Sequence, residues 1–204
     1  MGAYERFVLP HLLALAMRSA VLVPFRKRVG SAASGRVLEI GVGPGLNLPF
    51  YGPDVREVIG IDPLLPLLRM AQARGLGTRF PVELVEALSE QLPIDSKSID
   101  TAVTTWTMCS VRDPASALRE VARVLRPGGT LLFVEHGRAP DARVRWWQDA
   151  LTPTWRRVAG GCHLNRPIEA LISQAGFRTE GLHAAYVPGP KPFAYMYEGS
   201  ARPE

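Results

Sequence analysis

The sequence contains little lysine and no apolar run long enough to cross a membrane. Lysine occupies only three of the 204 positions, so the net charge of +5 comes mainly from arginine. A membrane-spanning helix requires roughly 20 consecutive apolar residues, and the longest candidate, residues 7–25, is interrupted by Pro10, His11 and Arg18. The first residues also lack the charged start, apolar run and small-residue cleavage site of a secretory signal. We therefore expect a cytoplasmic protein.

Cysteine is also scarce, since Cys109 and Cys162 are the only two and form no Cys-x-x-Cys pair. Isolated thiols of this kind are typical of proteins from a reducing compartment. Cys162 directly precedes His163, but no second pair of ligands lies at a spacing usual for zinc. We expect no metal site.

The overall composition indicates a globular protein. Hydrophobic residues make up 47% and charged residues 21% of the chain, which is ordinary for one α/β domain of this length. The arginines are scattered and form no stripe with aromatic residues, so we expect no nucleic-acid partner. The basic excess reflects either a composition bias or attraction to an anionic lipid or substrate.

Short β-rich runs alternate with helical patterns through the middle of the chain. This alternation predicts an α/β fold with a parallel sheet and right-handed crossovers. A further helix at 168–177 and two closing strands at 178–187 and 191–199 follow. The expected strands of the middle part are 36–42, 57–62, 82–87, 99–105 and 129–136, and its expected helices are 64–75 and 113–129.

Other segments flank this middle part. Residues 4–28 have the apolar spacing of one or two helices, and residues 26–35 are typical of a charged linker that contains Gly and Ser. Residues 137–167 form an insertion rich in Trp and Arg. We expect a single domain, 1–204, that consists of a helical cap with linker, a core, the insertion and a closing part: 1–35, 36–136, 137–167 and 168–204.

Three glycines directly follow the first expected strand, in the stretch VLEIGVGPGLN. Gly41, Gly43 and Gly45 let the chain turn sharply and let a ligand approach the bare backbone. We expect the turn to open a helix whose free N–H groups favour a carboxylate or phosphate. Asp62 ends the second strand, where an acid that binds ribose hydroxyls is expected. The spacing is GxGxG, whereas nicotinamide dehydrogenases use GxGxxG.

This glycine pattern, with Glu39 two residues before it, resembles the signature of class I S-adenosylmethionine-dependent methyltransferases. The fourth strand, which ends at Thr105, matches the family, as do the stretches VIGIDP, SEQLPIDSKSID and LREVARVLRPGGTLLFVE. The resemblance covers residues 36–136, and its last stretch is similar to the ubiquinone/menaquinone methyltransferases. It implies a Rossmann-like, mostly parallel sheet of seven strands with helices on both faces, an antiparallel last strand and an N-terminal helical segment.

The resemblance also implies S-adenosylmethionine as the cofactor. The glycines would face its methionine and ribose parts, and Asp62 would accept both ribose hydroxyls through charge-assisted hydrogen bonds. Glu39 would either support the loop or contact the methionine ammonium, directly or through water. Many relatives carry Asp where this chain has Leu88, so contact with the adenine amino group falls to Glu86 or a backbone group. The implied cofactor-binding residues are Glu39, Gly41, Gly43, Gly45, Asn47, Asp62, Pro63, Leu64, Ser89, Glu90 and Thr105.

Past this core, the chain resembles the microsomal thiol S-methyltransferases and their bacterial relatives. The stretches that carry this resemblance are TTWTMCSVRDP, RVLRPGGTLLFVEH and WWQDALTPTWRRVAGGCHLNR. They imply methyl transfer to a small apolar acceptor, with a thiol favoured. A phospholipid or quinone precursor is the alternative acceptor, and a non-catalytic regulatory module that binds S-adenosylmethionine is the alternative of another class. Residues 4–28 either cover the substrate pocket or make weak contact with a membrane surface, which would place the protein at the membrane periphery.

Candidate acceptor-side residues lie at the strand ends and in the insertion. His136 ends the fifth strand, on the rim where open α/β sheets bind ligands, and is the candidate catalytic residue, as a base or as a group that orients the acceptor. A structural hydrogen bond is its alternative role. Cys109 is expected to be a small wall residue, because direct methyl transfer needs no covalent enzyme intermediate. The expected acceptor contacts are Trp106, Cys109, His163, Asn165 and Arg166.

Overall fold

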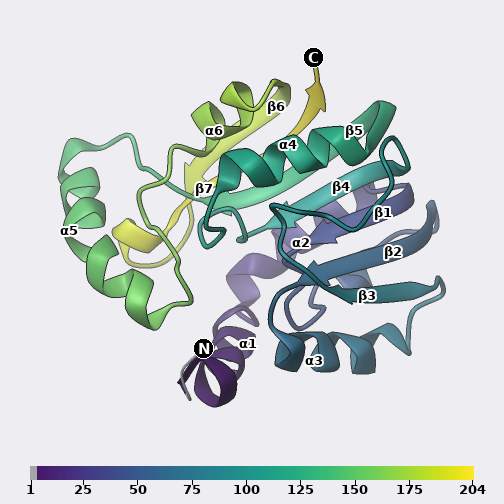
Figure 1. Cartoon of the computed structure of the whole chain (residues 1–204). Coiled ribbons are helices and arrows are strands. Elements are labelled where there is room, and N and C mark those ends of the chain that lie inside the picture. The colour runs from purple at the N-terminus through teal and green to yellow at the C-terminus, as the bar shows by residue number, and fades with distance from the viewer. Residues whose placement is uncertain (1–3) are drawn as a thin grey trace.

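The computed structural model describes residues 4–204, except for the side chains of residues 5 and 6, and consists of one seven-stranded sheet flanked by helices (Figure 1). The part of the expected cap that covers residues 1–3 lies outside the described residues. The strands are β1 (Gly35–Ile40), β2 (Val55–Asp62), β3 (Val82–Glu86), β4 (Ile99–Thr105), β5 (Leu125–His136), β6 (Phe177–Tyr186) and β7 (Tyr195–Pro203). The α-helices are α1 (Leu9–Ala16), α2 (Val23–Ala32), α3 (Leu65–Gly75), α4 (Pro114–Val124), α5 (Ala142–Val158) and α6 (Ile168–Gln174). Short helical turns of other types are η1 (Tyr4–Val8), η2 (Ala20–Leu22), η3 (Leu48–Phe50) and η4 (Lys191–Phe193).

The strands lie in the order β3-β2-β1-β4-β5-β7-β6. All neighbouring pairs among β1 to β5 are parallel, whereas β7 runs antiparallel to both β5 and β6. The last strand of the chain therefore inserts between its two neighbours. The predicted mostly parallel, seven-stranded α/β sheet with an antiparallel last strand is confirmed.

Two apolar clusters cover the two faces of the sheet. Leu38 belongs to the cluster that contains Leu118 of α4 and Ile172 of α6, while its neighbour Val37 belongs to the cluster that contains Val29 of α2. Successive strand residues point to opposite faces, so one strand supplies both cores. Burial of each large aliphatic side chain stabilises the fold by roughly 1.5–3 kcal/mol. The two clusters confirm the prediction of helices on both faces.

Helix α4 shows how local signals fix an element beside the site. The Asp113 side chain accepts a hydrogen bond of 3.1 Å from the backbone N–H of Ser116, which caps the helix, and Pro114 occupies the first turn. Leu118, Val121 and Val124 recur at helical spacing and are buried on the sheet. The helix ends earlier than predicted, because β5 already begins at Leu125.

The prediction of a linker at 26–35 is wrong for most of that range. Residues 26–32 are the continuation of α2. Gly30 suggested a flexible connection, but it lies so close to η3 that an added Cβ would be 2.4 Å from the carbonyl oxygen of Phe50. The glycine therefore serves the close packing of α2 on the segment after the glycine turn.

The prediction of a helix directly after the glycine turn is also wrong. Only the three-residue turn η3 follows, and Tyr51 is already extended. Pro53 explains the difference, because proline lacks the N–H that a continuing helix needs, whereas Pro49 lies in the first turn, where proline is tolerated. Anion binding at a helix N-terminus therefore cannot be assigned to this turn.

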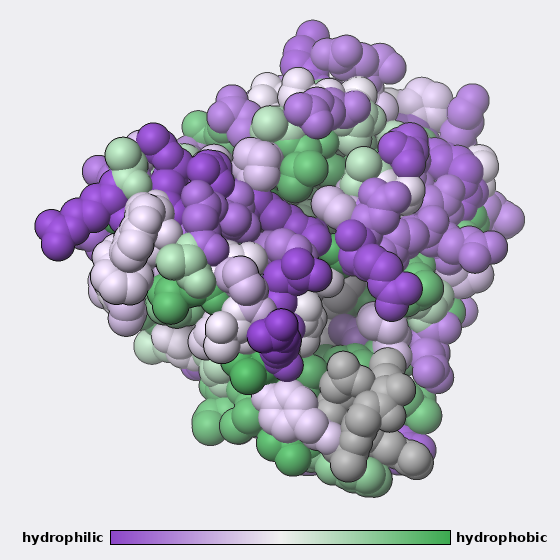
Figure 2. Space-filling model, turned by 60° about the vertical axis from the view of Figure 1, so that its left-hand side comes forward, coloured by the Kyte–Doolittle hydropathy of each residue, from purple (hydrophilic) through white to green (hydrophobic). Residues whose placement is uncertain are grey.

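The N-terminal helical segment consists of η1, α1, η2 and α2, as predicted for residues 4–28. Hydrophobic residues gather at the lower end of the face drawn in Figure 2, where this segment lies, below a band of hydrophilic residues. Among residues 4–204, none of the helices combines the length and the hydropathy that crossing a membrane requires.

Candidate functional site

A cavity of about 580 Å³ opens at the carboxyl ends of three central strands. Ile40, Asp62 and Thr105, the last residues of β1, β2 and β4, all line it. This is the rim where parallel α/β sheets bind their ligands, because neighbouring connections diverge there. The glycine turn forms one part of the wall and the end of α1 another.

The glycine turn presents bare backbone to the cavity. Gly41 and Gly43 line the cavity and have positive φ values of 66° and 53°. A Cβ on Gly41 would lie 2.3 Å from Oγ1 of Thr107, whereas a Cβ on Gly43 would meet only the carbonyl oxygen of Gly41, at 3.8 Å. Gly41 is therefore required by packing, and Gly43 leaves open space beside the backbone for a ligand.

Asp62 is held in place by the turn that it faces. Its Oδ2 accepts a hydrogen bond of 3.0 Å from the Gly43 N–H, and its Oδ1 accepts one of 2.8 Å from the Leu64 N–H. Burial raises the pKa of Asp62 to about 6, and the two backbone hydrogen bonds oppose that rise. Each carboxylate oxygen keeps a further lone pair, so the side chain can accept two hydroxyl groups.

Glu39 is the centre of a buried polar network under the cavity. Its Oε1 accepts 2.8 Å from the Asn47 amide and its Oε2 accepts 2.8 Å from the Tyr51 hydroxyl. Arg26 donates to Oδ1 of Asn47 at 2.5 Å and to the carbonyl oxygen of Met17 at 3.1 Å. Burial raises the pKa of Glu39 to about 7, against the hydrogen bonds and the charge of Arg26. Glu39 and Arg26 both line the cavity, so a carboxyl group and a guanidinium group, bridged by Asn47, belong to the same wall.

At another part of the cavity, Pro63, Leu64, Leu88, Ser89 and Glu90 form the wall. The Ser89 hydroxyl bonds Oε2 of Glu90 at 3.1 Å, and Oε1 of Glu90 accepts 3.1 Å from the Asp113 N–H. Leu88 presents an apolar side chain to this part of the cavity. This strip of five residues offers apolar contact for a flat ring. Ser89 and Glu90 add two polar groups at its edge.

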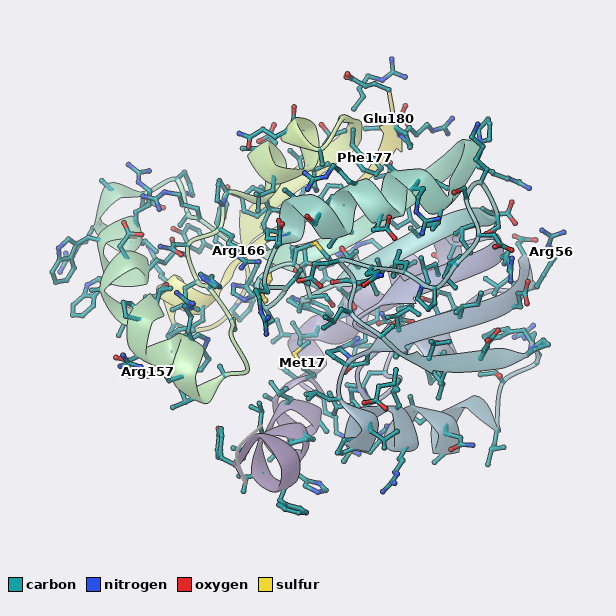
Figure 3. All side chains as sticks on the ribbon, in the orientation of Figure 1. Met17, Arg56, Arg157, Arg166, Phe177 and Glu180 are labelled. Carbon is teal, nitrogen blue, oxygen red and sulfur yellow. The ribbon has the colours of Figure 1, made fainter. Side chains whose placement is uncertain are left out.

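The apolar part of the remaining wall comes from distant parts of the chain and adjoins polar lining residues such as Ser110 and Arg112. Leu13 and Met17 from the N-terminal segment, Trp106 after β4 and Gly160 after α5 line it. Figure 3 shows Met17 in the space between α1 and the sheet. Trp106 packs edge-on against Phe25, with ring centroids 6.3 Å apart, and the Arg26 guanidinium lies 4.7 Å from its ring centroid. Its φ of 53° is unusual for a bulky residue, and strained backbone of this kind gathers at functional sites.

Most of the predicted cofactor residues share this cavity. Gly45 and Asn47 are outside its lining; Asn47 instead bridges Glu39, Arg26 and the Thr105 hydroxyl, the last at 2.9 Å. The predicted residues that line it are Glu39, Gly41, Gly43, Asp62, Pro63, Leu64, Ser89, Glu90, Thr105 and Trp106.

The other predicted acceptor-side residues lie outside the cavity lining. His136 Nε2 is 3.1 Å from Sγ of Cys162. The backbone N–H of His163 donates 2.8 Å to the carbonyl oxygen of Cys109, and Arg166 donates to the carbonyl oxygen of Met108. Figure 3 shows Arg166 between α5 and the sheet. The structure therefore brings Cys109, His136 and Cys162 together behind the wall that Trp106 and Ser110 form.

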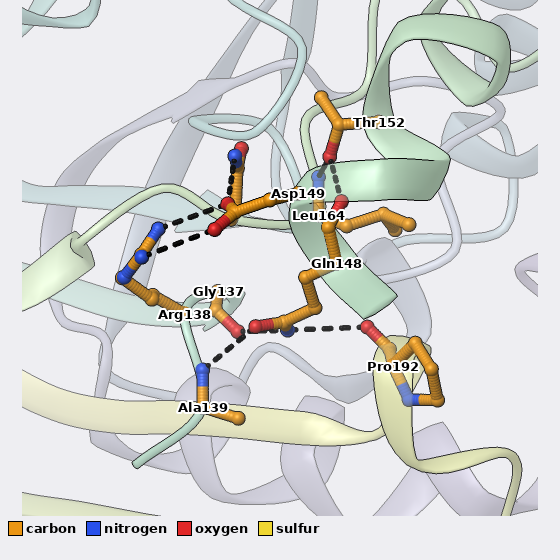
Figure 4. A network of polar contacts seen from close by, with 9 residues as sticks. Gly137, Arg138, Ala139, Gln148, Asp149, Thr152, Leu164 and Pro192 are labelled. Atoms are coloured by element: carbon orange, nitrogen blue, oxygen red, sulfur yellow. Dashed lines mark hydrogen bonds and ion pairs between the residues drawn. The ribbon is translucent and has the colours of Figure 1, made fainter. Parts of the chain in front are cut away.

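A polar network that Figure 4 shows ties parts of the insertion to one another and reaches η4 through the hydrogen bond from Gln148 to the carbonyl oxygen of Pro192, at 3.2 Å. Gln148 of α5 is fully buried; it donates 2.9 Å to the carbonyl oxygen of Gly137 and accepts 3.0 Å from the Ala139 N–H. Asp149 pairs with Arg138 at 3.1 Å and accepts 2.7 Å from the Asn165 amide. Asn165 thus bonds another residue of the insertion rather than lining the cavity.

Cys109 interacts with the neighbouring side chains of Cys162 and His136. A hydrogen bond from Cys162 and the charge of His136 hold the pKa of the Cys109 thiol well below its ordinary value, against burial. Burial, followed by the charge of Cys109, raises the pKa of Glu135 to about 8. Oε1 of Glu135 accepts 3.1 Å from the Thr107 N–H, whereas its Oε2 has no hydrogen-bond partner among the described residues.

The sequence reasoning missed Arg26, Leu13 and Met17 as cavity residues. No sequence signal marked Arg26, because it begins the basic run Arg26, Lys27 and Arg28, and only the structure shows that its side chain is 5% exposed. Leu13 and Met17 have the same apolar spacing in the sequence as residues of the core, so the sequence cannot distinguish them. Only the position of α1 beside the glycine turn brings them to the site.

Comparison with known proteins agrees with this geometry. The family model described as Methyltransferase domain matches residues 38–133. Thiol S-methyltransferase TMT1B of Rattus norvegicus is 33% identical over 174 residues, which cover 83% of this chain and 69% of that protein. Human thiol S-methyltransferase TMT1A is 35% identical over 152 residues, 72% of this chain and 62% of that protein.

A solved structure reproduces nearly the whole fold. An S-adenosylmethionine-dependent methyltransferase from Thermotoga maritima superposes with a TM-score of 0.70 and 22% identity, over 98% of both chains. At that identity the likeness shows the fold alone.

The chain belongs to the class I S-adenosylmethionine-dependent methyltransferases and is an enzyme of that class. Within the class it belongs to the group that includes the mammalian thiol S-methyltransferases. The predicted family and the predicted methyltransferase activity are confirmed. Use of S-adenosylmethionine follows from the family, whereas the assignment of individual residues to it is a proposal.

Proposed function

We propose that the protein transfers the methyl group of S-adenosylmethionine to the sulfur of a small apolar thiol. The observation that carries the proposal is that similarity to a thiol S-methyltransferase spans 174 residues, well beyond the methyltransferase core at 38–133. It therefore includes parts of the chain that build the acceptor side. The apolar wall of Leu13, Met17 and Trp106 supports an acceptor of that kind.

The polar part of the cavity supports binding of the cofactor. Asp62 can accept two ribose hydroxyls, and the strip with Pro63, Leu64 and Ser89 suits the adenine ring. The pair of Glu39 and Arg26 matches the ammonium and carboxylate of an amino acid, and a guanidinium binds a carboxylate in bidentate fashion. S-adenosylmethionine, when bound, supplies a methyl group on a positively charged sulfonium.

The chain's part in methyl transfer is alignment. An in-line displacement gains most from holding the two reacting atoms in near-attack geometry and from excluding water. Trp106 lies between the two halves of the cavity, in contact range of Arg26 on one side and at the start of the apolar wall. A thiol attacks as thiolate, which has an ordinary pKa of about 8.5. His136 lies behind this wall, so we assign it a positioning role through Cys162 and no contact with the acceptor.

Turnover with a panel of acceptors tests this function. Reduced full-length protein is incubated with S-adenosylmethionine and a short alkyl thiol, a phenol, an amine or phosphatidylethanolamine vesicles, and S-adenosylhomocysteine is measured. We expect product with the thiol and a rate that rises with pH toward the thiol pKa. Product with another acceptor but none with thiols would reject the thiol assignment and leave the methyltransferase assignment intact.

A phospholipid or quinone precursor is the second candidate acceptor, and the surface of α1 favours it. Leu12 and Leu15 are 50% and 69% exposed, beside Leu13 and Met17 of the cavity. Phosphatidylethanolamine N-methyltransferase of Cereibacter sphaeroides is 36% identical over 108 residues, 52% of this chain and 53% of that protein. A membrane-bound acceptor would reach the cavity across this helix while the protein stays cytoplasmic and peripheral.

Flotation with anionic vesicles tests this second candidate. Leu12→Ser combined with Leu15→Ser should abolish co-flotation, and Leu76→Ser, at a residue 86% exposed on the far end of α3, is the matched control. Equal flotation of both variants and of the unchanged protein would remove α1 as a membrane contact.

A further inference from the structure

Cys109, His136 and Cys162 converge from three segments that are far apart in the sequence. Their ligand atoms, the two Sγ atoms and a ring nitrogen, all lie within 4.8 Å of one another. Cys109 is 2% exposed, and His136 and Cys162 are each 9% exposed. Three soft or borderline ligands therefore share one nearly closed site.

The distances suit a tetrahedral cation. Zn²⁺ binds thiolate sulfur at about 2.3 Å and imidazole nitrogen at about 2.0 Å, so tetrahedral geometry places S and N ligands roughly 3.5 Å apart. His136 Nε2 lies 3.1 Å from Sγ of Cys162, and the other two distances stay below 4.8 Å. All three separations are therefore within the range from which side-chain adjustment can reach tetrahedral geometry.

The surroundings favour a positive charge at this point. Glu135 is fully buried, and its Oε2 has no hydrogen-bond partner among the described residues. Its charge interacts with Cys109 and with His136, so it lies within electrostatic range of the cluster. A buried carboxylate oxygen without a partner costs free energy, which a cation nearby offsets. The Trp155 Nε1–H donates to Sγ of Cys162 at 3.3 Å, as outer groups do for ligating sulfur.

We propose that Cys109, His136 and Cys162 bind one thiophilic divalent cation, with Zn²⁺ as the reference ion. Binding forms two metal–sulfur bonds and one metal–nitrogen bond, and the two thiol protons pass to solvent. The cation joins the segment after β4, the end of β5 and the insertion. It thereby fixes the wall that Trp106, Ser110 and Gly160 present to the cavity.

The site replaces the sequence-based expectation of no metal. That expectation considered ligand pairs close in sequence, and Cys162 with His163 is indeed no pair, because the ring and N–H of His163 both bond the carbonyl oxygen of Cys109. The ligands that converge are instead separated by 26 residues for His136 and Cys162.

Spectroscopy with Co²⁺ tests the site in the full-length, reduced protein. We expect one equivalent of Co²⁺ to produce thiolate-to-cobalt charge-transfer absorption and strong tetrahedral d–d bands, and one equivalent of Zn²⁺ to displace it. Cys162→Ser and His136→Gln should weaken Zn²⁺ binding at least about 100-fold, since even outer-shell changes cost 10- to 100-fold. His183→Gln on β6 is the matched control and should bind as the unchanged protein does.

Two further measurements distinguish a missing metal site from two other causes of weak binding, a folding defect and a disulfide between Cys109 and Cys162. Far-ultraviolet circular dichroism and S-adenosylhomocysteine binding report whether each variant is folded. Labelling of thiols under denaturing conditions should count two free cysteines that Zn²⁺ protects in the native protein. Absence of charge-transfer absorption with both thiols free, or equal Zn²⁺ affinity in Cys162→Ser, would overturn the proposal, and neither result bears on the thiol acceptor.

Discussion

Two regions at the same rim of the sheet differ in whether their polar side chains face the cavity or are enclosed by other segments. At the ends of β1 and β2, Glu39, Asp62 and the glycine turn face an open cavity. In the segment after β4 and at the end of β5, Cys109 and His136 are closed off behind Trp106 and the insertion. A position on the rim therefore does not by itself bring a side chain into contact with a ligand. The segments packed over the rim decide which groups stay accessible.

The largest expected effect tests the open region through Asp62. Asp62→Ala should weaken S-adenosylhomocysteine binding by about 100-fold, because two hydrogen bonds to a charged group are lost at roughly 1.5 kcal/mol each. Titration calorimetry measures the affinity, with Asp95→Ala on the exposed surface as control. Affinities within threefold of each other would show that Asp62 does not hold the ribose.

Gly41 and Gly43 lie in the same region but have different roles: Gly41 is required for close packing, and Gly43 leaves space for a ligand. Gly41→Ala should lower the free energy of unfolding by about 3 kcal/mol, because the Cβ would overlap Thr107 and the positive φ adds strain. Gly43→Ala should cost about 1 kcal/mol, from strain alone, yet still weaken cofactor binding. Urea unfolding and calorimetry measure the two quantities. Equal losses of stability would contradict the division of roles between these glycines.

Trp106 marks the border between the regions. Trp106→Ala should raise KM for an apolar thiol about tenfold, because roughly 1.4 kcal/mol of apolar contact is lost, while S-adenosylhomocysteine affinity changes little. Trp147→Ala is the control, since Trp147 is 46% exposed and lies outside the cavity lining. A loss in cofactor affinity as large as the change in KM would place Trp106 on the cofactor side.

The smallest effect concerns pH. Burial raises the pKa of Asp62 to about 6, and the ionised carboxylate is the form that accepts the ribose hydroxyls. Affinity for S-adenosylhomocysteine should therefore be full well above pH 6 and fall as pH drops through that value, by about fourfold at pH 5.5. Asp62→Asn should remove this part of the profile. A profile that is unchanged in Asp62→Asn would assign the titration to Glu39, whose pKa is about 7.

Much of the open region was predictable from the sequence. Gly41 and Gly43 follow a strand whose apolar residues are consecutive, and Asp62 ends the next strand, so local pattern sufficed to place them on the rim. The linker at 26–35 and the helix after the glycine turn were predicted wrongly. Gly30, which usually marks a flexible connection, serves close packing instead, and the helix after the turn does not form because Pro53 lacks the N–H that it would need.

The acceptor side was less predictable, because its residues meet only through the packing of remote segments. Trp106 was placed correctly next to the cavity, whereas His163, Asn165 and Arg166 bond other parts of the protein. Leu13, Met17 and Arg26 come from the N-terminal segment, which precedes every motif of the cofactor site in the sequence.

The sequence by itself determined the alternation of strands and helices, the glycine turn and the acid after β2, because each depends on periodicity or on chemistry within a few neighbouring residues. Only the tertiary structure decided which strand-end residues are open and which are enclosed. Cys109, His136 and Cys162 meet in one site although 26 residues separate the last two along the chain. Such contacts depend on how α5 and its loop pack over the sheet, and no local pattern records that packing.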